Sequence, residues 1–232
     1  MKVLHVVASP RSDGSNTLRV SESFLDALES QREDLEIETI DLYNHDLPGV
    51  AGENIENKYL LMGGAALGDT QLPAWKDIED LIASFKDADL HVISSPMWNF
   101  SIPYALKYYI DAIVQPGYTF RYDEQGRAIG MVEGKRMVCI TTRGGDYSPG
   151  TPFHAYDFQE PYLRAIFGFI GFTEMEFVNA QPMDITPELR EKAITEALQR
   201  ADDLASWAAS APDGAEPATP SPPELKPEPL QP

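Results

Sequence analysis

Short apolar segments alternate with amphipathic segments through most of this chain, and this alternation limits the possible folds more than any other feature. The apolar runs lie at 2–8, 35–42, 90–95, 136–142 and 173–178, and hydrophobic residues at helical spacing lie at 16–31, 74–87, 104–113, 160–168 and 187–209. Parallel strands are buried on both faces, so they read as continuous apolar runs separated by helices. The pattern predicts an α/β fold with a doubly wound sheet of five parallel strands, for which we expect the order 2-1-3-4-5.

Three segments do not fit this repeat. Residues 44–72 are long and rich in glycine, with room for one short helix, and 118–133 has the composition of an inserted hairpin that turns at Asp123–Gly126. Residues 211–232 contain eight prolines, four acidic residues and one lysine. Such a composition cannot bury enough apolar surface to offset its chain entropy. We therefore predict one domain over 1–210 and a disordered, acidic, proline-rich tail over 211–232.

The charge and cysteine content exclude several classes of function. The chain has 37 acidic and 18 basic residues and a formal net charge of −19, which argues against nucleic-acid binding because phosphate backbones are bound by clustered Lys and Arg. The single cysteine, Cys139, rules out an internal disulfide and a cysteine-based zinc cluster, and we expect no bound metal. No apolar run approaches the ~18 residues of a membrane span. These observations predict a cytoplasmic protein that makes no membrane contact.

Ligands of open α/β sheets bind beyond the carboxyl ends of the strands, where the strand order reverses. The loops that follow the first, third and fourth predicted strands are 9–17, 95–103 and 142–147. For the expected strand order these loops meet at one edge of the sheet. They also hold hydroxyls, glycines and aromatic residues, so we expect the functional site there.

The first loop has the composition of a phosphate-binding turn. Ser9, Ser15 and Thr17 lie directly before or at the start of a predicted helix, whose N-terminal amides and partial positive charge favour an anion. The glycine pattern of dinucleotide-binding folds and the Walker sequence are both absent. From this loop alone, an N-cap at Ser15 within a polar turn explains the pattern equally well.

The other two loops suit a flat ring. Trp98 and Phe100 flank Asn99, which needs hydrogen-bond partners if it is buried, although the two aromatic residues alone would also fit a hydrophobic core. Gly144 and Gly145 allow the backbone to approach a ligand closely, and the neighbouring Arg143 could offer charge to it; a surface turn is the alternative. Together the loops describe a site for a phosphorylated planar ring, and FMN fits best because it carries one phosphate and one large redox ring.

Several separate motifs resemble one family. The sequences PMWNF at 96–100, SIP at 101–103, LKYYID at 106–111, TFRY at 119–122, ITTRGG at 140–145 and FGFIG at 167–171 are similar to stretches of the FMN-dependent NADH-azoreductases, which are flavodoxin-like NAD(P)H:quinone oxidoreductases. The resemblance covers roughly residues 1–207. It implies a flavodoxin-like fold and a homodimer with FMN at two sites, each built by both subunits. NADH or NADPH would be the co-substrate.

The resemblance also assigns roles to residues. The family's contacts with the FMN phosphate fall on Ser9, Ser15, Asn16 and Thr17. Its contacts with the flavin ring fall on Met97, Trp98, Asn99, Phe100, Thr142, Arg143, Gly144 and Gly145. Phe120 in the predicted hairpin corresponds to a position near the substrate. No catalytic acid or base is implied, because N5 of the flavin carries the hydride.

The predicted function is hydride transfer from NAD(P)H through FMN to quinones and azo compounds in a two-step exchange at one site. A flavodoxin-like one-electron carrier is the alternative, and a flavin-free regulatory protein is a third possibility. Three residues are expected in the core: His5 and His91 in strands, and Cys139 in the middle of a strand. His154 lies in the loop after the third motif, from which it could reach a substrate.

Overall fold

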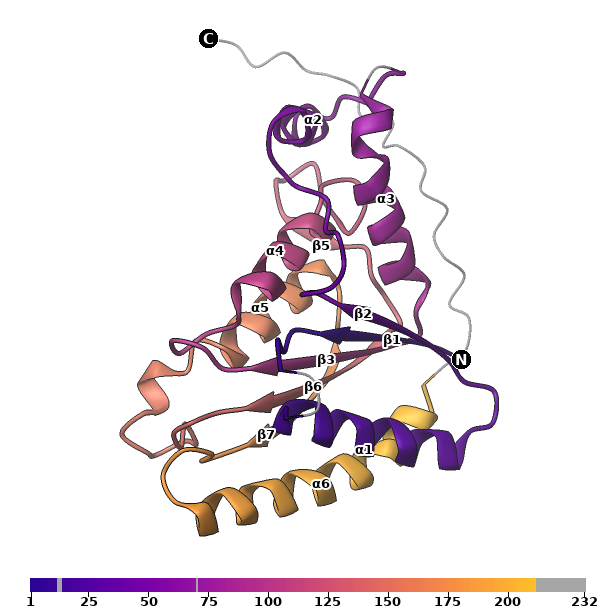
Figure 1. The fold of residues 1–232 in the computed structure, drawn as a ribbon. Helices are drawn as coiled ribbons and strands as arrows, with labels where there is room; N and C mark the ends of the chain where they lie inside the picture. Colours follow the sequence, from indigo (N-terminus) through magenta and orange to yellow (C-terminus); the bar gives the residue numbers. More distant parts are fainter. Residues whose placement is uncertain (12–13, 70, 212–232) are drawn as a thin grey trace.

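A computed structural model describes residues 1–11, 14–69 and 71–211. The central sheet contains β1 (Lys2–Val7), β2 (Glu36–Asp41), β3 (Leu90–Pro96), β6 (Arg136–Thr142) and β7 (Glu174–Ala180). Its strands lie in the order β2-β1-β3-β6-β7, and every neighbouring pair is parallel. The helices are α1 (Asn16–Gln31), α2 (Glu53–Met62), α3 (Leu72–Asp87), α4 (Tyr104–Ile113), α5 (Glu160–Ile170) and α6 (Pro187–Ala209) (Figure 1). The predicted α/β fold with a parallel sheet is confirmed.

The strand numbering differs from the prediction. Counted along the whole chain, the order is 2-1-3-6-7 and not 2-1-3-4-5, because β4 (Phe120–Tyr122) and β5 (Ala128–Gly130) come between β3 and β6 in the chain. These two short strands pair antiparallel with each other and not with the central sheet. They lie within the segment 118–133, and Gly126 between them has a φ of 74°, a conformation that glycine adopts without steric cost.

Helices cover both faces of the sheet (Figure 1). On one face α1 and α6 lie side by side, and their apolar residues, such as Phe24 and Leu204, form a core with the β-strands. On the other face α3, α4 and α5 bury a second core that includes Trp75, Tyr109 and Phe167. His91 and Cys139 are fully buried and His5 nearly so, as predicted. The two cores explain why the strands read as apolar runs without alternation.

Side chains cap two helices at the points where the site-forming loops after β1 and β7 end. Ser15 caps α1 by accepting a hydrogen bond from the Leu18 backbone N–H at 3.2 Å, and Thr186 caps α6 by accepting one from Leu189 at 3.3 Å.

The C-terminal end of α6 is held by the Arg32 guanidinium, which donates to the Ala209 carbonyl at 3.1 Å. A cation at this end is favourable, because the last carbonyls carry a partial negative charge.

Two further segments were singled out in the sequence, at 44–72 and at 211–232. The long segment 44–72 contains the short helix α2, whose Tyr59 and Met62 are exposed. The predicted tail at 211–232 lies, apart from Ala211, outside the described residues. Within the described part of the chain, none of the helices has both the length and the apolar character needed to span a bilayer.

Candidate functional site

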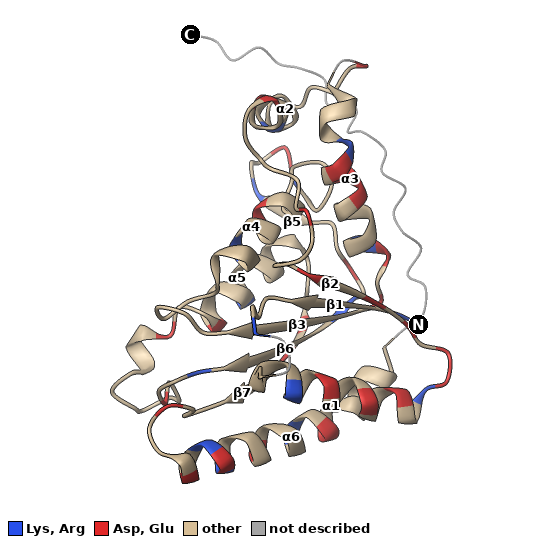
Figure 2. Cartoon of the chain, in the orientation of Figure 1, with Lys and Arg blue, Asp and Glu red and all other residues tan. Residues whose placement is uncertain are grey.

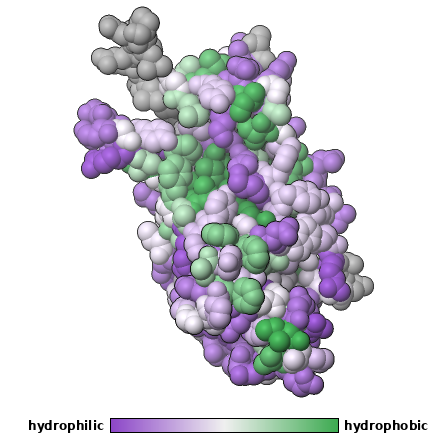
Figure 3. All heavy atoms as spheres, turned by 90° about the vertical axis from the view of Figure 1, so that its left-hand side faces the viewer, coloured by the Kyte–Doolittle hydropathy of each residue, from purple (hydrophilic) through white to green (hydrophobic). Residues whose placement is uncertain are grey.

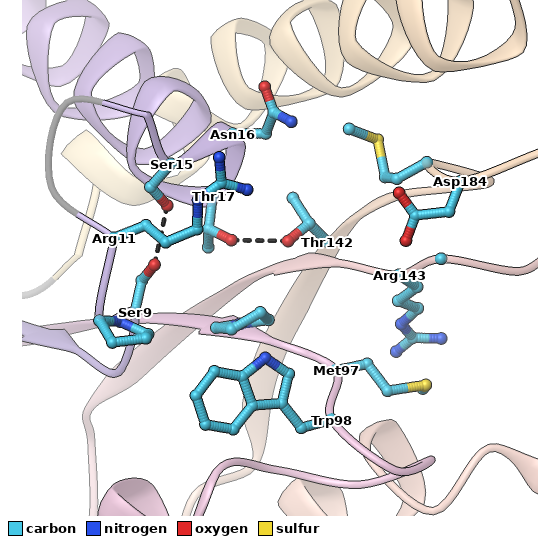
Figure 4. A pocket seen from close by; sticks show the side chains of 14 residues that line it. Ser9, Arg11, Ser15, Asn16, Thr17, Met97, Trp98, Thr142, Arg143 and Asp184 are labelled. Atoms are coloured by element: carbon cyan, nitrogen blue, oxygen red, sulfur yellow. Dashed lines mark hydrogen bonds between the residues drawn. The ribbon is translucent and has the colours of Figure 1, made fainter. Parts of the chain in front are cut away.

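The carboxyl edge of the sheet contains a cavity of about 220 Å³ (Figure 4). It is formed by the loop between β1 and α1, the loop after β3, the loop after β6 and the loop after β7. Its lining residues are Ser9, Pro10, Arg11, Ser15, Asn16, Thr17, Pro96, Met97, Trp98, Thr142, Arg143, Gly144, Met183 and Asp184. Three loops predicted from the sequence to converge are therefore brought together, and a fourth joins them.

Hydroxyl groups gather beside the N-terminus of α1. The Oγ atoms of Ser9 and Ser15 lie 2.9 Å apart, and the Oγ1 atoms of Thr17 and Thr142 lie 2.6 Å apart, as the dashed lines in Figure 4 mark. Ser15 also caps α1 through the same Oγ, so the N-cap interpretation is confirmed and is compatible with the predicted phosphate contact. A hydroxyl can donate one hydrogen bond while accepting others, so these groups can turn toward an anion without losing all their partners.

Arg11 is a lining residue that the sequence did not single out. An added Cβ at Gly14 would lie 3.4 Å from Nη2 of Arg11, which places the guanidinium over the turn that enters α1. Arg11 is exposed and makes no ion pair with any residue that the structure describes. Acidic residues predominate along α1 and α6 (Figure 2), so Arg11 and the start of α1 form a local positive site in a negative molecule.

The second loop forms a strained turn. Trp98 and Ser101 exchange backbone hydrogen bonds of 2.9 and 3.0 Å, and between them Asn99 and Phe100 have φ values of 47° and 70°. Left-handed backbone is costly for a bulky residue such as Phe, and such strain is concentrated at functional sites. Trp98 and Phe100 remain 39% and 42% exposed, so their assignment to a hydrophobic core is wrong.

Asn99 and Phe100 do not line the cavity itself. Asn99 is exposed, and no hydrogen bond of its side chain to another described residue is seen, so the expectation of a buried amide in need of partners does not apply. Both residues nevertheless follow the lining residues Met97 and Trp98 directly in the chain.

Arg143 lines the cavity, but its charge is directed elsewhere. Figure 4 shows its side chain extending away from Asp184, and the side chain is 1% exposed. Its Nη1 donates to Oδ2 of Asp157 at 2.8 Å, and its Nη2 lies 3.6 Å from Oε2 of Glu160. In this chain the charge that the sequence suggested for a ligand therefore faces two carboxylates inside the protein.

The two glycines of the third loop differ in their surroundings. An added Cβ at Gly144 would lie 2.8 Å from Oδ2 of Asp184, so the absence of a side chain brings this carboxylate close to the loop. Gly145 does not line the cavity, and an added Cβ there would be 3.4 Å from the ring of Tyr147. Met183 and Asp184 were missed by sequence reasoning because the loop after β7 has no distinctive composition.

Phe120 and His154 also lie outside the cavity. Phe120 is 7% exposed, with its ring centroid 4.7 Å from that of Phe169. Neighbouring side chains thus cover most of the Phe120 ring within one chain, and its contact with a substrate stays a prediction. Nδ1 of His154 lies 3.0 Å from the Tyr147 carbonyl, which holds the imidazole against its own loop.

The titratable groups in and near the cavity are few. No histidine lines the cavity, and burial lowers the pKa of His5, the histidine of β1, to about 4, so its ring is neutral near pH 7. Hydrogen bonds from Ser148 hold the pKa of the Asp146 carboxyl below its usual value, so that side chain stays an acceptor. Among the described residues, no group of His, Cys, Asp and Glu side chains is arranged to hold a metal ion.

Comparisons with known proteins agree with this architecture. A family model described as "Flavodoxin-like fold" matches residues 1–205. The FMN-dependent NADH:quinone oxidoreductase of Nitratidesulfovibrio vulgaris strain DP4 is 38% identical over 204 residues, which are 88% of this chain and 97% of that protein. FMN-dependent NADH:quinone oxidoreductase 3 of Pseudomonas fluorescens is 34% identical over 90% of this chain and 98% of its own.

Solved structures show the same relationship. An FMN-dependent NADH-azoreductase from Bacillus anthracis strain Ames Ancestor, described in complex with FMN, superposes with a TM-score of 0.80 at 27% identity. The superposition covers 90% of this chain and 99% of that one. The fold and the site thus define a flavodoxin-like protein. More narrowly, the chain belongs to the family of FMN-dependent NADH:quinone oxidoreductases and azoreductases.

Proposed function

We propose that this protein is an FMN-dependent oxidoreductase that passes a hydride from NADH or NADPH through FMN to quinones and azo compounds in a two-step exchange. The observation that carries the proposal is the set of hydroxyls of Ser9, Ser15 and Thr17 beside Arg11 at the start of α1. The names of the relatives, FMN-dependent NADH:quinone oxidoreductases and azoreductases, support it and favour an enzyme over a one-electron carrier.

The residues present fit the phosphate end of FMN. Hydroxyls and the unpaired N–H groups at the start of α1 are donors, and Arg11 supplies a full positive charge. We assign Ser9, Ser15, Asn16 and Thr17 to this end, as the sequence predicts, and add Arg11. A cavity of about 220 Å³ is smaller than the ~300–1,000 Å³ that encloses a whole drug-sized ligand, so it suits the phosphate-bearing end alone.

The ring end is assigned to the part of the cavity formed by the loops after β3 and β6. Met97, Trp98, Thr142 and Gly144 line it, and Asn99, Phe100 and Gly145 are their direct neighbours in sequence. Exposed aromatic side chains such as Trp98 and Phe100 can stack on a flat ring. FMN, when bound, supplies the redox chemistry, because it accepts a hydride and then passes two electrons to the acceptor.

The contribution of the chain is to bind, orient and stabilise charge. We propose that backbone N–H groups near Gly144 and Gly145, together with the side chain of Asn99, stabilise negative charge that develops on the ring during reduction. Preorganised donors of this kind lower a barrier without moving a proton. The absence of histidine from the lining agrees with a reaction that needs no acid or base from the protein.

We further propose a homodimer. The side of the molecule at which the strands end shows apolar surface gathered near its middle (Figure 3). Large exposed hydrophobic side chains occur on α2, the turn after β3, α4 and the loop before α5: Tyr59, Leu60, Met62, Trp98, Phe100, Tyr104, Tyr108, Phe153, Tyr156 and Phe158. A large apolar surface of this kind is typical of an interface, and light scattering coupled to gel filtration will report a dimer mass if the proposal is correct.

Domain organisation and location complete the proposal. We assign residues 1–210 to one FMN-binding domain, with the tail outside it, and the family match over residues 1–205 supports that boundary. We place the protein in the cytoplasm. A single buried thiol, Cys139, whose pKa is raised by burial, is compatible with a reducing compartment.

The decisive experiment is to purify the protein, record its visible spectrum after incubation with FMN, and follow NADH oxidation with and without a benzoquinone. We expect a bound flavin spectrum and NADH oxidation that depends on the quinone. A protein that binds FMN yet oxidises NADH only with a protein partner would instead be a carrier. A protein that binds no FMN would refute the proposal.

A further inference from the structure

One short segment, residues 157–160 at the start of α5, contacts the loops after β3 and β6, which both line the cavity. No residue of the segment itself lines the cavity. It hydrogen-bonds to the end of β3, to the turn after β3 and to Arg143 after β6. A segment with contacts to each of these parts can set their relative positions.

The contact with the third loop is an ion pair in the protein interior. Arg143 donates from Nη1 to Oδ2 of Asp157 at 2.8 Å and from Nε to Oγ1 of Thr141 at 3.1 Å. The main chain of Arg143 is held as well, because its carbonyl accepts from the Met183 N–H at 2.9 Å. Both the side chain and the backbone of Arg143 are therefore held, which fixes the start of the loop that carries Gly144.

The contact with the second loop is made by Gln159, which is fully buried. Its Nε2 donates to the Pro96 carbonyl at 3.0 Å, and the Phe158 N–H donates to the Phe100 carbonyl at 3.0 Å. One bond thus holds the end of β3, and the other holds the strained turn that follows it. The amide of Gln159 is itself buried, so the loss of its acceptor would leave a buried donor unpaired, which is costly.

Asp157 joins the two contacts. Its Oδ1 accepts from the backbone N–H groups of Gln159 and Glu160 at 3.0 and 3.1 Å, while its Oδ2 accepts from Arg143. Glu160 extends the network to β7, because its Oε2 accepts from Nδ2 of Asn179 at 2.8 Å. A shift of this segment would therefore move both loops at once.

We propose that Gln159 and Arg143 are positioning residues, with Arg143 acting through Asp157. They hold the loops after β3 and β6 at the spacing that FMN requires, and their side chains make no contact with FMN. This inference rests on the proposed function. It replaces the role that the sequence suggested for Arg143, since the guanidinium acts from inside the protein. FMN affinity is then sensitive to substitutions at buried positions outside the cavity.

The test compares FMN affinity and apoprotein stability in matched variants of the full chain. Gln159→Met keeps the side-chain length and removes both polar groups, Arg143→Met removes the charge, and Arg143→Lys restores the charge without the fork of donors. The control is Lys135→Met. Lys135 is also buried and its Nζ lies 3.6 Å from Oδ1 of Asp89, but it is beside the first residue of β6, at the opposite edge of the sheet.

FMN dissociation constants are measured by quenching of flavin fluorescence at a temperature where every variant is folded. We expect Gln159→Met to raise the dissociation constant roughly two- to tenfold, the range of one hydrogen bond. Arg143→Met should raise it further, and Arg143→Lys should recover part of the loss. Lys135→Met should lower the melting temperature and leave the FMN dissociation constant unchanged.

Two results would overturn the inference in different ways. If the wild-type protein binds FMN and both Gln159→Met and Arg143→Met bind it equally well, the segment is merely structural and the inference fails alone. If the wild-type protein binds no FMN, the proposed function fails and the inference fails with it. Should Arg143→Met not fold, Gln159→Met and Arg143→Lys decide the outcome by the same measurement.

Discussion

Ser15 performs two separable tasks in this structure, and its substitution by alanine tests both. Its Oγ caps α1 through the Leu18 N–H at 3.2 Å and lies 2.9 Å from Oγ of Ser9 in the cavity. Loss of an N-cap hydroxyl costs about 1 kcal/mol of stability. Loss of its partner leaves the buried Ser9 hydroxyl with one bond fewer, so we expect the free energy of unfolding of the apoprotein to fall by ~1–2 kcal/mol.

FMN affinity should fall by a larger amount. A hydrogen bond to a charged group contributes about 1.5–3 kcal/mol, which corresponds to a rise of roughly 10- to 150-fold in the FMN dissociation constant. The control is Thr186→Ala, which removes the equivalent cap from α6, where Thr186 accepts from Leu189 at 3.3 Å and does not line the cavity. This control should lose about 1 kcal/mol of stability and no FMN affinity.

Urea denaturation of the apoproteins gives the first quantity, and titration of FMN fluorescence gives the second. The reasoning would be refuted if Ser15→Ala lost stability to the same extent as Thr186→Ala but bound FMN with the wild-type dissociation constant. Ser15 would then be a helix cap alone, and the phosphate assignment at the start of α1 would lose its principal residue.

Three further predictions follow from other parts of the molecule. An alanine Cβ at Gly130 would lie 2.3 Å from the backbone nitrogen of Gly171, so Gly130→Ala should destabilise the protein by ~2 kcal/mol or more in urea titrations. The control is Gly63→Ala, whose Cβ would have its nearest contacts at 3.5 Å and which should cost under ~1 kcal/mol in the same measurement. Phe100 has a φ of 70°, so Phe100→Gly should relieve backbone strain and stabilise the apoprotein by about 1 kcal/mol. The same variant should turn over NADH and quinone more slowly, and unchanged turnover would remove Phe100 from the site. Burial lowers the pKa of His5 and of His91 to about 4 in the folded protein, whereas in the unfolded chain both imidazoles become protonated near pH 6.5. The free energy of unfolding should therefore fall as the pH falls from about 6.5 to about 4, by about 3 kcal/mol per histidine. His5→Gln should remove roughly half of that difference between unfolding at pH 7 and pH 4.5, and an unchanged slope would show that His5 is not the group responsible.

The sequence alone determined the architecture because parallel strands and their covering helices leave direct patterns. The runs at 90–95 and 136–142 are apolar because β3 and β6 are buried on both faces, and the helix predicted at 104–113 has the bounds of α4. The place of the site followed from the same pattern, since the strand order sends the loops after β1, β3 and β6 to one edge. Ser15 could be identified twice, as a cap and as a site residue, because both roles depend on its position at the start of a helix.

Only the tertiary structure decided which side chains of those loops face the cavity. Arg143 follows β6 in a loop that suits a ligand, yet Asp157 and Glu160, distant in sequence, neutralise its guanidinium in the interior. Phe120 lies in a motif of the family, yet packing against Phe169 buries its ring. Arg11 and Asp184 became visible as lining residues only when the chain was folded. Secondary structure depends on local spacing, which a sequence records, whereas the direction of a loop side chain depends on partners that only the packed fold brings near.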